Sequence, residues 1–282
     1  MWRLRLGEVE HDLSTRTLVM GVLNRTTDSF FDAGRYFAFD DFLALAGRLV
    51  AEGADILDIG GVKAGPGPEI GEGEELERVV PAVAALHDRF DVALSVDTWR
   101  SSVLAEACGA GAVVGNDISG FSDPAYLSTA AAAGATVVAT HIRLAPRVAD
   151  PDPIYDDLVG DVRSFLVERV ARAMKAGVAD DRIVVDAGLD LGKTPAQSLE
   201  LLRRSDALCD LGAPLLLSAS NKRFLGDLLD LPVDRRTMAG HAAHALGITR
   251  GCRILRVHDV KGARRVADVL AAILEARVRV RG

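Results

Sequence analysis

The sequence predicts an α/β fold of the (β/α)8 TIM barrel class with a short N-terminal hairpin. Short aliphatic and β-branched runs alternate with longer stretches that show helical apolar spacing, and eight such units follow one another. The runs are apolar on both faces, which indicates a parallel sheet covered on its outside by helices. Because no pair of shorter or more polar edge strands is evident, a closed barrel is favoured over an open sheet.

The expected strands are the aliphatic runs that separate the helical stretches. They are 17–23, 54–60, 92–97, 112–116, 136–140, 182–186, 214–218 and 253–258. Ahead of them, the first 16 residues alternate apolar and polar side chains around Gly7, which predicts a hairpin that closes the bottom of the barrel. No linker long enough to separate two domains is present, so we expect one domain over 1–282.

The expected helices have apolar residues three and four positions apart. In 40–52, for example, Phe42, Leu45, Ala46 and Leu49 share one face. The expected helices are 40–52, 74–90, 101–109, 124–133, 156–177, 195–204, 234–249 and 261–276. Pro81 lies inside the second of these and is expected to kink or restart it.

Composition excludes several classes of partner. The 33 basic and 40 acidic residues give a net charge of −7, which provides no overall basic field for nucleic acid or anionic lipid. No run of 18 apolar residues and no signal-peptide pattern is present. The three cysteines form no CxxC pair. We therefore expect a cytoplasmic protein without a nucleic-acid or membrane partner.

Polar or ionisable residues stand at the ends of nearly all the expected strands. They are Asn24, Asp58, Asp97, Asn116, His141, Asp186, Ser218, Arg256 and His258. One such residue alone is more often a helix cap or a core group, but in a barrel all of them meet at the rim that builds active sites. Carboxylates and amides suit a polar heterocycle, and basic groups at the last strand suit a phosphate. A pterin-like or purine-like ring with a phosphate is therefore the expected ligand.

Seven segments then stand in order along the chain. They are MGVLNRTTDSFFDAG (20–34), GADILDIGG (53–61), LSVDT (94–98), GNDISG (115–120), VVDAGLDLGKT (184–194), SNKRFLG (220–226) and RVHDV (256–260). Together they resemble dihydropteroate synthase over residues 17–276. The resemblance implies a barrel that joins p-aminobenzoate to 6-hydroxymethyl-7,8-dihydropterin diphosphate in folate biosynthesis, with loss of Mg²⁺-bound diphosphate. It also implies a homodimer through the later helices, which include 234–249.

The resemblance assigns expected roles to individual residues. The implied pterin-binding residues are Asp97, Asn116, Asp186 and Lys222. The implied diphosphate-binding residues are Asn24, which is also associated with the metal, Arg256 and His258. Phe30 and Asp32 match the mobile first loop of the family. Mg²⁺ is the expected cofactor wherever diphosphate is bound.

Departures from the family pattern affect the diphosphate and aminobenzoate sides of the site. In GGVKAGPG (60–67), Ala64 and Gly65 replace a threonine and an arginine, and Lys63 can replace the lost guanidinium only in part. Leu191 replaces the aromatic residue that packs against the aminobenzoate ring, and Asp190 replaces a glycine. Asn221 and Arg223 stand for an arginine and a serine. No catalytic residue is assigned with certainty.

Three functions are compatible with this pattern. The first is an active dihydropteroate synthase, and the second is a divergent paralogue of the dihydropteroate synthase 2 type that keeps much of the pterin pocket but has little or no synthase activity. The third, methyl transfer from a reduced folate to a corrinoid, is disfavoured by RVHDV and SNK and by the lack of a cobalamin module. Since losing one preorganised electrostatic group costs about 10²–10³ in rate, the simultaneous changes favour the second function.

Overall fold

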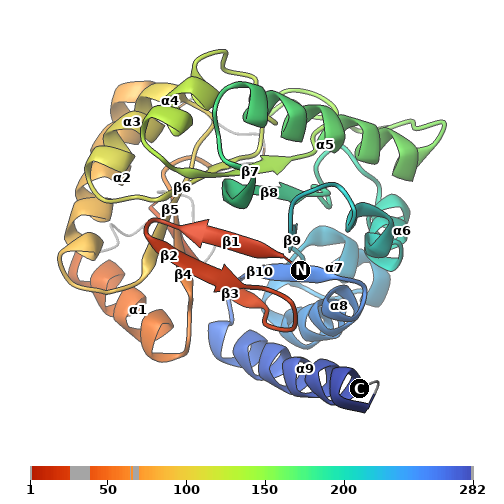
Figure 1. The fold of residues 1–282 in the computed structure, drawn as a ribbon. Helices are drawn as coiled ribbons and strands as arrows, with labels where there is room; N and C mark the ends of the chain where they lie inside the picture. The colour runs from red at the N-terminus through yellow and green to blue at the C-terminus, as the bar shows by residue number, and fades with distance from the viewer. Residues whose placement is uncertain (1, 26–38, 64, 66–69, 281–282) are drawn as a thin grey trace.

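The computed structural model describes residues 2–25, 39–63, 65 and 70–280 of the chain. Within this part, eight parallel strands close into a barrel in the order β10-β3-β4-β5-β6-β7-β8-β9. The helices surround the barrel on its outside (Figure 1). The predicted (β/α)8 barrel is therefore confirmed.

The strands of the barrel are short and almost wholly buried. They are β3 (Leu18–Asn24), β4 (Ile56–Gly60), β5 (Ala93–Asp97), β6 (Val114–Asp117), β7 (Thr136–Thr140), β8 (Ile183–Asp186), β9 (Leu215–Leu217) and β10 (Cys252–Val257). The helices are α1 (Phe39–Ala51), α2 (Glu72–His87), α3 (Ser101–Gly109), α4 (Tyr126–Ala132), α5 (Leu158–Lys175), α6 (Pro195–Arg203), α7 (Arg223–Leu229), α8 (Thr237–Thr249) and α9 (Val260–Val280). Each predicted strand and helix corresponds to one of these elements.

Two details of the helices differ from the expectation. Helix α7 was not predicted, because seven residues are too few to show a helical period. The expected restart at Pro81 was wrong, since α2 runs through that residue without a break. Pro81 and Glu77 are exposed, so water can take the place of the backbone hydrogen bond that proline cannot donate to the Glu77 carbonyl.

The predicted N-terminal hairpin is present and closes one end of the barrel. Strands β1 (Arg3–Leu6) and β2 (Val9–Asp12) pair in antiparallel fashion around Gly7, whose φ of 57° favours glycine. The hairpin lies across the barrel in Figure 1. Leu4, Leu6 and Leu13 are buried against the apolar side chains that fill the lower barrel. Because the hairpin covers this end, a functional site is expected at the opposite end of the barrel.

No helix in the described ranges is long and apolar enough to cross a lipid bilayer.

Candidate functional site

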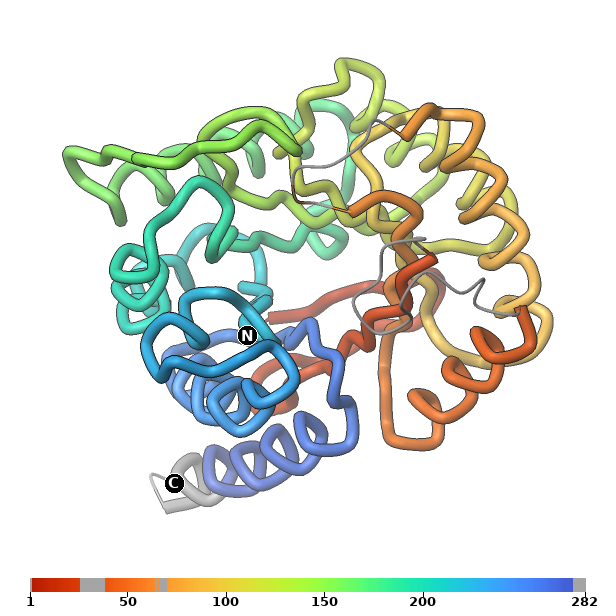
Figure 2. Tube along the Cα trace, turned by 180° about the vertical axis from the view of Figure 1, so that it is seen from behind, coloured from red at the N-terminus to blue at the C-terminus, as the bar shows by residue number. Residues whose placement is uncertain are grey.

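The inward-facing side chains of the strands change from apolar to polar along each strand, and the polar ones form the site. Side chains that point into the barrel recur every second residue. In β4 the inward positions are Ile56 and then Asp58, and in β10 they are Ile254 and then Arg256. An apolar layer therefore lies near the hairpin and a polar layer lies above it, at the carboxyl ends of the strands. Figure 2 shows this end of the barrel and the loops that follow the strands.

A buried ion pair network lies at the centre of the polar layer. Arg256 Nε donates to Asp58 Oδ2 at 2.6 Å, and Arg256 Nη2 donates to Asp97 Oδ2 at 2.8 Å. The side chain of Asp58 is fully buried, whereas those of Arg256 and Asp97 keep 19% and 12% of their surface exposed. Burial raises the pKa of Asp97 above its ordinary value, and the charge of Arg256 opposes this rise. Asp97 and Arg256 therefore remain accessible from the mouth.

Two neutral side chains donate further hydrogen bonds to the Asp58 carboxylate. Ser95 Oγ donates to Asp58 Oδ1 at 2.6 Å, and Asn116 Nδ2 donates to Asp58 Oδ2 at 3.1 Å. The carboxylate thus receives hydrogen bonds from strands β5, β6 and β10. Asp58 orients Asn116 and Arg256 from below, so that both face the same space.

Asp186 and Lys222 form the other side of the mouth. Asp186 Oδ1 accepts from the Gly188 N–H at 2.8 Å, and Lys222 Nζ donates to the Leu189 carbonyl. Burial raises the pKa of Asp186, while the Lys222 ammonium lowers it. The loop after β8 and the loop before α7 are therefore held so that the Asp186 carboxyl group and the Lys222 ammonium lie close together.

Asn24 and His258 lie at the rim. The Oδ1 atom of Asn24 is adjacent to Gly60, and the residue is exposed at the end of β3. His258 Nδ1 lies 3.1 Å from Ser220 Oγ, and burial together with Arg256 lowers the pKa of His258 to about 4. His258 is therefore neutral near pH 7 and can offer hydrogen bonds rather than charge.

His141 has a packing role. Its Nδ1 lies 2.9 Å from the buried Lys193 ammonium, which also donates to the Gly188 and Leu191 carbonyls. The His141 ring meets Phe165 edge to face at 4.8 Å. Burial lowers the pKa of His141 to about 3, with Lys193 contributing in the same direction. His141 and Lys193 together hold the loop after β8 in place.

A cavity of about 390 Å³ adjoins the mouth. It lies between the loop after β7, the segment 190–195, Gly65 and Arg223. The loop is shaped by the bidentate pair of Arg143 with Asp150, and Arg147 Nη1 donates to the Lys63 carbonyl at 3.2 Å. The apolar part of the wall is aliphatic and comes from Ile142, Leu144, Val148, Pro151, Pro153 and Leu191.

Comparison with known proteins identifies the family. The family described as "Pterin binding enzyme" matches residues 20–258. The dihydropteroate synthase of Bacillus subtilis is 41% identical over 261 residues, which cover 92% of this chain and 89% of that protein. The inactive dihydropteroate synthase 2 of Mycobacterium leprae is also 41% identical, over 93% of this chain and 92% of that protein. This chain belongs to the dihydropteroate synthase family.

The solved structures agree with this assignment. The dihydropteroate synthase of Yersinia pestis, determined as a sulfonamide drug complex, has a TM-score of 0.92 with 38% identity, covering 97% of this chain and 99% of that one. The dihydropteroate synthase of Xanthomonas albilineans with 4-aminobenzoic acid has a TM-score of 0.88 with 37% identity, covering 96% and 97%. The barrel described above is thus the dihydropteroate synthase fold.

The structure brings most of the residues implied by the family resemblance to one mouth. Five of them surround the same space: Asp97, Asn116, Asp186, Lys222 and Arg256. Asn24 and His258 stand at its edge. Phe30, Asp32 and Ala64 lie outside the described residues. Gly65 and Leu191 line the adjoining cavity.

Sequence reasoning assigned no role to Asp58, although it was recognised as a polar strand end. The signal was its inward position two residues after Ile56, inside an otherwise apolar strand. Only the structure shows that its carboxylate joins Arg256, Asn116 and Ser95. We regard Asp58 as the residue that positions two members of the site.

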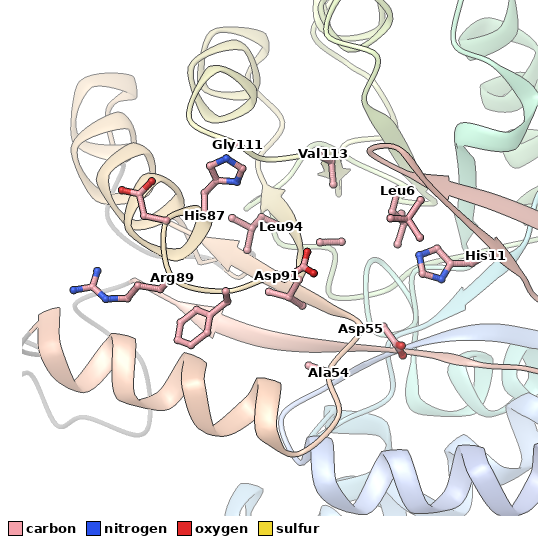
Figure 3. A pocket seen from close by; sticks show the side chains of 15 residues that line it. Leu6, His11, Ala54, Asp55, His87, Arg89, Asp91, Leu94, Gly111 and Val113 are labelled. Carbon is pink, nitrogen blue, oxygen red and sulfur yellow. The ribbon is translucent and has the colours of Figure 1, made fainter.

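A cavity of about 690 Å³ lies at the opposite end of the barrel. Its walls are the hairpin and the turns that precede β4, β5 and β6, with His11, Asp55, His87 and Asp91 among the labelled residues (Figure 3). None of the site residues named above reaches it.

Proposed function

We propose that this member of the dihydropteroate synthase family recognises a pterin at the barrel mouth and has little or no synthase activity. One observation carries the proposal. The groups suited to a polar heterocycle are assembled and oriented, whereas the altered positions Gly65, Asp190, Leu191 and Arg223 line the adjoining cavity, where the second substrate would be expected.

The mouth has the chemistry to recognise a pterin. The carboxyl oxygens of Asp97 and Asp186 can accept hydrogen bonds from ring N–H and amino groups, while Asn116 both donates and accepts. Lys222 and Arg256 donate to ring carbonyl and nitrogen acceptors. Because these groups are fixed by their own hydrogen bonds, little side-chain entropy is lost when the ring binds.

Beside the adjoining cavity, the groups that the family resemblance implies for an aromatic acid and a leaving diphosphate are replaced at two described positions, although Arg147, Lys193 and Arg223 line it. Among the described residues, a Cβ atom on Gly65 would meet nothing within 4 Å, so space is left there where the family has an arginine. At Leu191 the aromatic stacking contact, worth about 1 kcal/mol, is lost. Positions 65 and 191 therefore no longer supply the support that the family residues would give as diphosphate leaves.

The residues present are compatible with Mg²⁺ carried by a diphosphate. No three His, Cys, Asp or Glu side chains within the described residues are grouped to hold a metal ion. Mg²⁺ commonly keeps several waters and binds through substrate phosphates with one or two protein oxygens. Asn24 Oδ1 at the end of β3 can supply one such oxygen, and the metal would then neutralise phosphate charge.

Calorimetry tests the proposal directly. We expect wild-type protein to bind 6-hydroxymethyl-7,8-dihydropterin, and we expect Asp97→Ala to weaken binding by about 1–3 kcal/mol, because a buried donor on the ring is left without a partner. Asp88→Ala is the matched control, since Asp88 lines the cavity at the other end of the barrel. Absence of pterin binding by the wild type would contradict the proposal.

Active synthase is the second candidate. The identity to the Bacillus subtilis synthase equals that to the inactive Mycobacterium leprae protein, so overall similarity favours neither function. The assay described in the Discussion separates the two.

We also propose that the chain forms a homodimer through α7 and α8. Met238, Leu228 and Leu229 expose 78%, 58% and 51% of their surface there, whereas Ile248 packs against the barrel. Sedimentation at micromolar concentration should give twice the 29.9 kDa of one chain, and Met238→Glu should shift the protein toward monomer. Val9→Glu, at a hairpin position that is 58% exposed, as Leu228 is, should leave the dimer intact. A wild-type monomer would exclude this interface.

A further inference from the structure

The backbone of Asp190 has an unusual conformation. Its φ is 66°, in the left-handed region that residues other than glycine rarely adopt. Asp and Asn are the residues that tolerate this region best, because their short polar side chains can bond to nearby groups.

The Asp190 carboxylate joins three segments of the chain. Its Oδ2 accepts from the backbone N–H groups of Arg223 at 2.6 Å and Phe224 at 3.4 Å. Ser198 Oγ in α6 donates to Asp190 Oδ1 at 3.3 Å, and the Asp190 N–H donates to the same hydroxyl at 3.1 Å. The loop after β8 is thus fastened both to α6 and to the first residues of α7.

Lys222 makes a hydrogen bond in the opposite direction, from the segment before α7 to the loop after β8. It immediately precedes Arg223, and its ammonium donates to the carbonyl of Leu189, the residue before Asp190. The segments 189–190 and 222–224 therefore hold each other by hydrogen bonds in both directions. A shift of either segment would move the Lys222 ammonium away from the mouth.

Lys222 lies among charges of both signs. The groups that act on it electrostatically are Asp190 from the loop after β8, Asp186 from β8, Asp97 from β5, Arg256 from β10 and Lys193 from the segment before α6. If Lys222 is counted, three acidic and three basic side chains lie together. The loss of one carboxylate would remove an attraction that favours the charged form of Lys222.

We propose that Asp190 is a positioning residue that holds Lys222 at the pterin site and keeps its ammonium charged. The inference rests on the proposed function, in which Lys222 contacts the pterin. Asp190 fixes the backbone that carries Lys222 through two N–H groups, and its charge lies close to a half-buried cation. A glycine at this position would adopt the same φ but would supply neither the bonds nor the charge.

The electrostatic part of this role has a predictable sign. Burial lowers the pKa of Lys222, and Asp190 is the first of the carboxylates that raise it again. If Asp190 loses its charge, the pKa of Lys222 falls further. Lys222 then loses its proton at a lower pH than in the wild type. Pterin affinity that depends on the ammonium is therefore also lost at a lower pH.

The test compares two variants that each remove one carboxylate charge near α7. Asp190→Asn keeps a side-chain acceptor but removes the charge, whereas Asp227→Asn removes the exposed partner of Arg223 on the same helix. Calorimetry with 6-hydroxymethyl-7,8-dihydropterin would be repeated from about pH 6 to about pH 10. We expect the alkaline loss of affinity to move down by about one pH unit in Asp190→Asn and to stay unchanged in Asp227→Asn.

A second measurement needs no ligand. The NMR titration of the Lys222 side chain, assigned with Lys222→Arg, should show the same downward shift in Asp190→Asn. Unchanged titration and unchanged binding profile would overturn the inference. A shifted titration in a protein that binds no pterin would support the inference and contradict the proposed function. If Asp190→Asn fails to fold, Asp190→Gly removes the same charge without strain at φ 66°.

Discussion

Purified protein supplied with p-aminobenzoate, 6-hydroxymethyl-7,8-dihydropterin diphosphate and Mg²⁺ should release diphosphate at least roughly 10²-fold more slowly than the Bacillus subtilis synthase. The reason is the loss of a guanidinium at Gly65 and of an aromatic wall at Leu191, both beside the cavity that adjoins the mouth. A coupled assay for diphosphate measures the difference. Turnover comparable to that of the Bacillus enzyme would contradict the proposed function.

Reversion should recover part of the rate. Gly65→Arg combined with Leu191→Phe restores the family residues at two positions, and the open space around Gly65 allows the larger side chain to enter. We expect a gain of roughly tenfold or more, because a donor that stabilises the departing charge acts directly on the transition state. Gly73→Arg is the matched control, since Gly73 is equally open but lies in the first turn of α2. An equal gain in the control would indicate a nonspecific effect of charge.

Removal of Arg256 should cause the largest loss of stability. Arg256→Met leaves Asp58 fully buried with only Ser95 and Asn116 as donors, and breaking a buried ion pair in this way costs about 3–5 kcal/mol. Urea denaturation would measure the loss as a lower midpoint. The double variant Arg256→Met with Asp58→Leu should recover part of it, because the fully buried charge of Asp58 is then removed while Asp97 still lacks its partner.

Arg223→Met is the control for this measurement. Arg223 pairs with Asp227 at 3.0 Å on the surface of α7, where the two side chains are 78% and 39% exposed. Surface pairs of this kind contribute about 1 kcal/mol or less. If Arg256→Met were as mild as Arg223→Met, the network at Asp58 would not be the stabilising element that we describe.

The inward and outward alternation of the strands made much of this architecture predictable from sequence. A run such as 54–60 has one apolar set for the helices and another for the barrel interior, so a period of two predicts which of its side chains face each side. The family motifs then placed Asp97, Asn116, Asp186 and Lys222 in one pocket. In the structure, Asp97, Asn116 and Asp186 stand at the carboxyl ends of their strands. Lys222 directly precedes α7, in the loop that follows β9.

The roles that could not be predicted from the sequence depend on contacts between segments that lie far apart in the chain. The bonds from Arg256 to Asp58 and Asp97 span 198 and 159 positions, and no local pattern reports them. The sequence showed Asp190 only as the replacement of a glycine on the aminobenzoate side of the site. Its carboxylate instead accepts backbone hydrogen bonds from residues 33 and 34 positions away.

The N-terminal hairpin has a consequence for how the chain is made. Its polar contacts reach residues that are synthesised much later: Asp181 binds Arg5 across 176 positions, and Arg253 donates to the Leu13 carbonyl across 240. At roughly 5–20 residues per second, the ribosome needs on the order of tens of seconds to supply these partners. During that time Leu4 and Leu6 have no barrel to enter, so a chaperone that shields short apolar strands would act most effectively on this segment of the nascent chain.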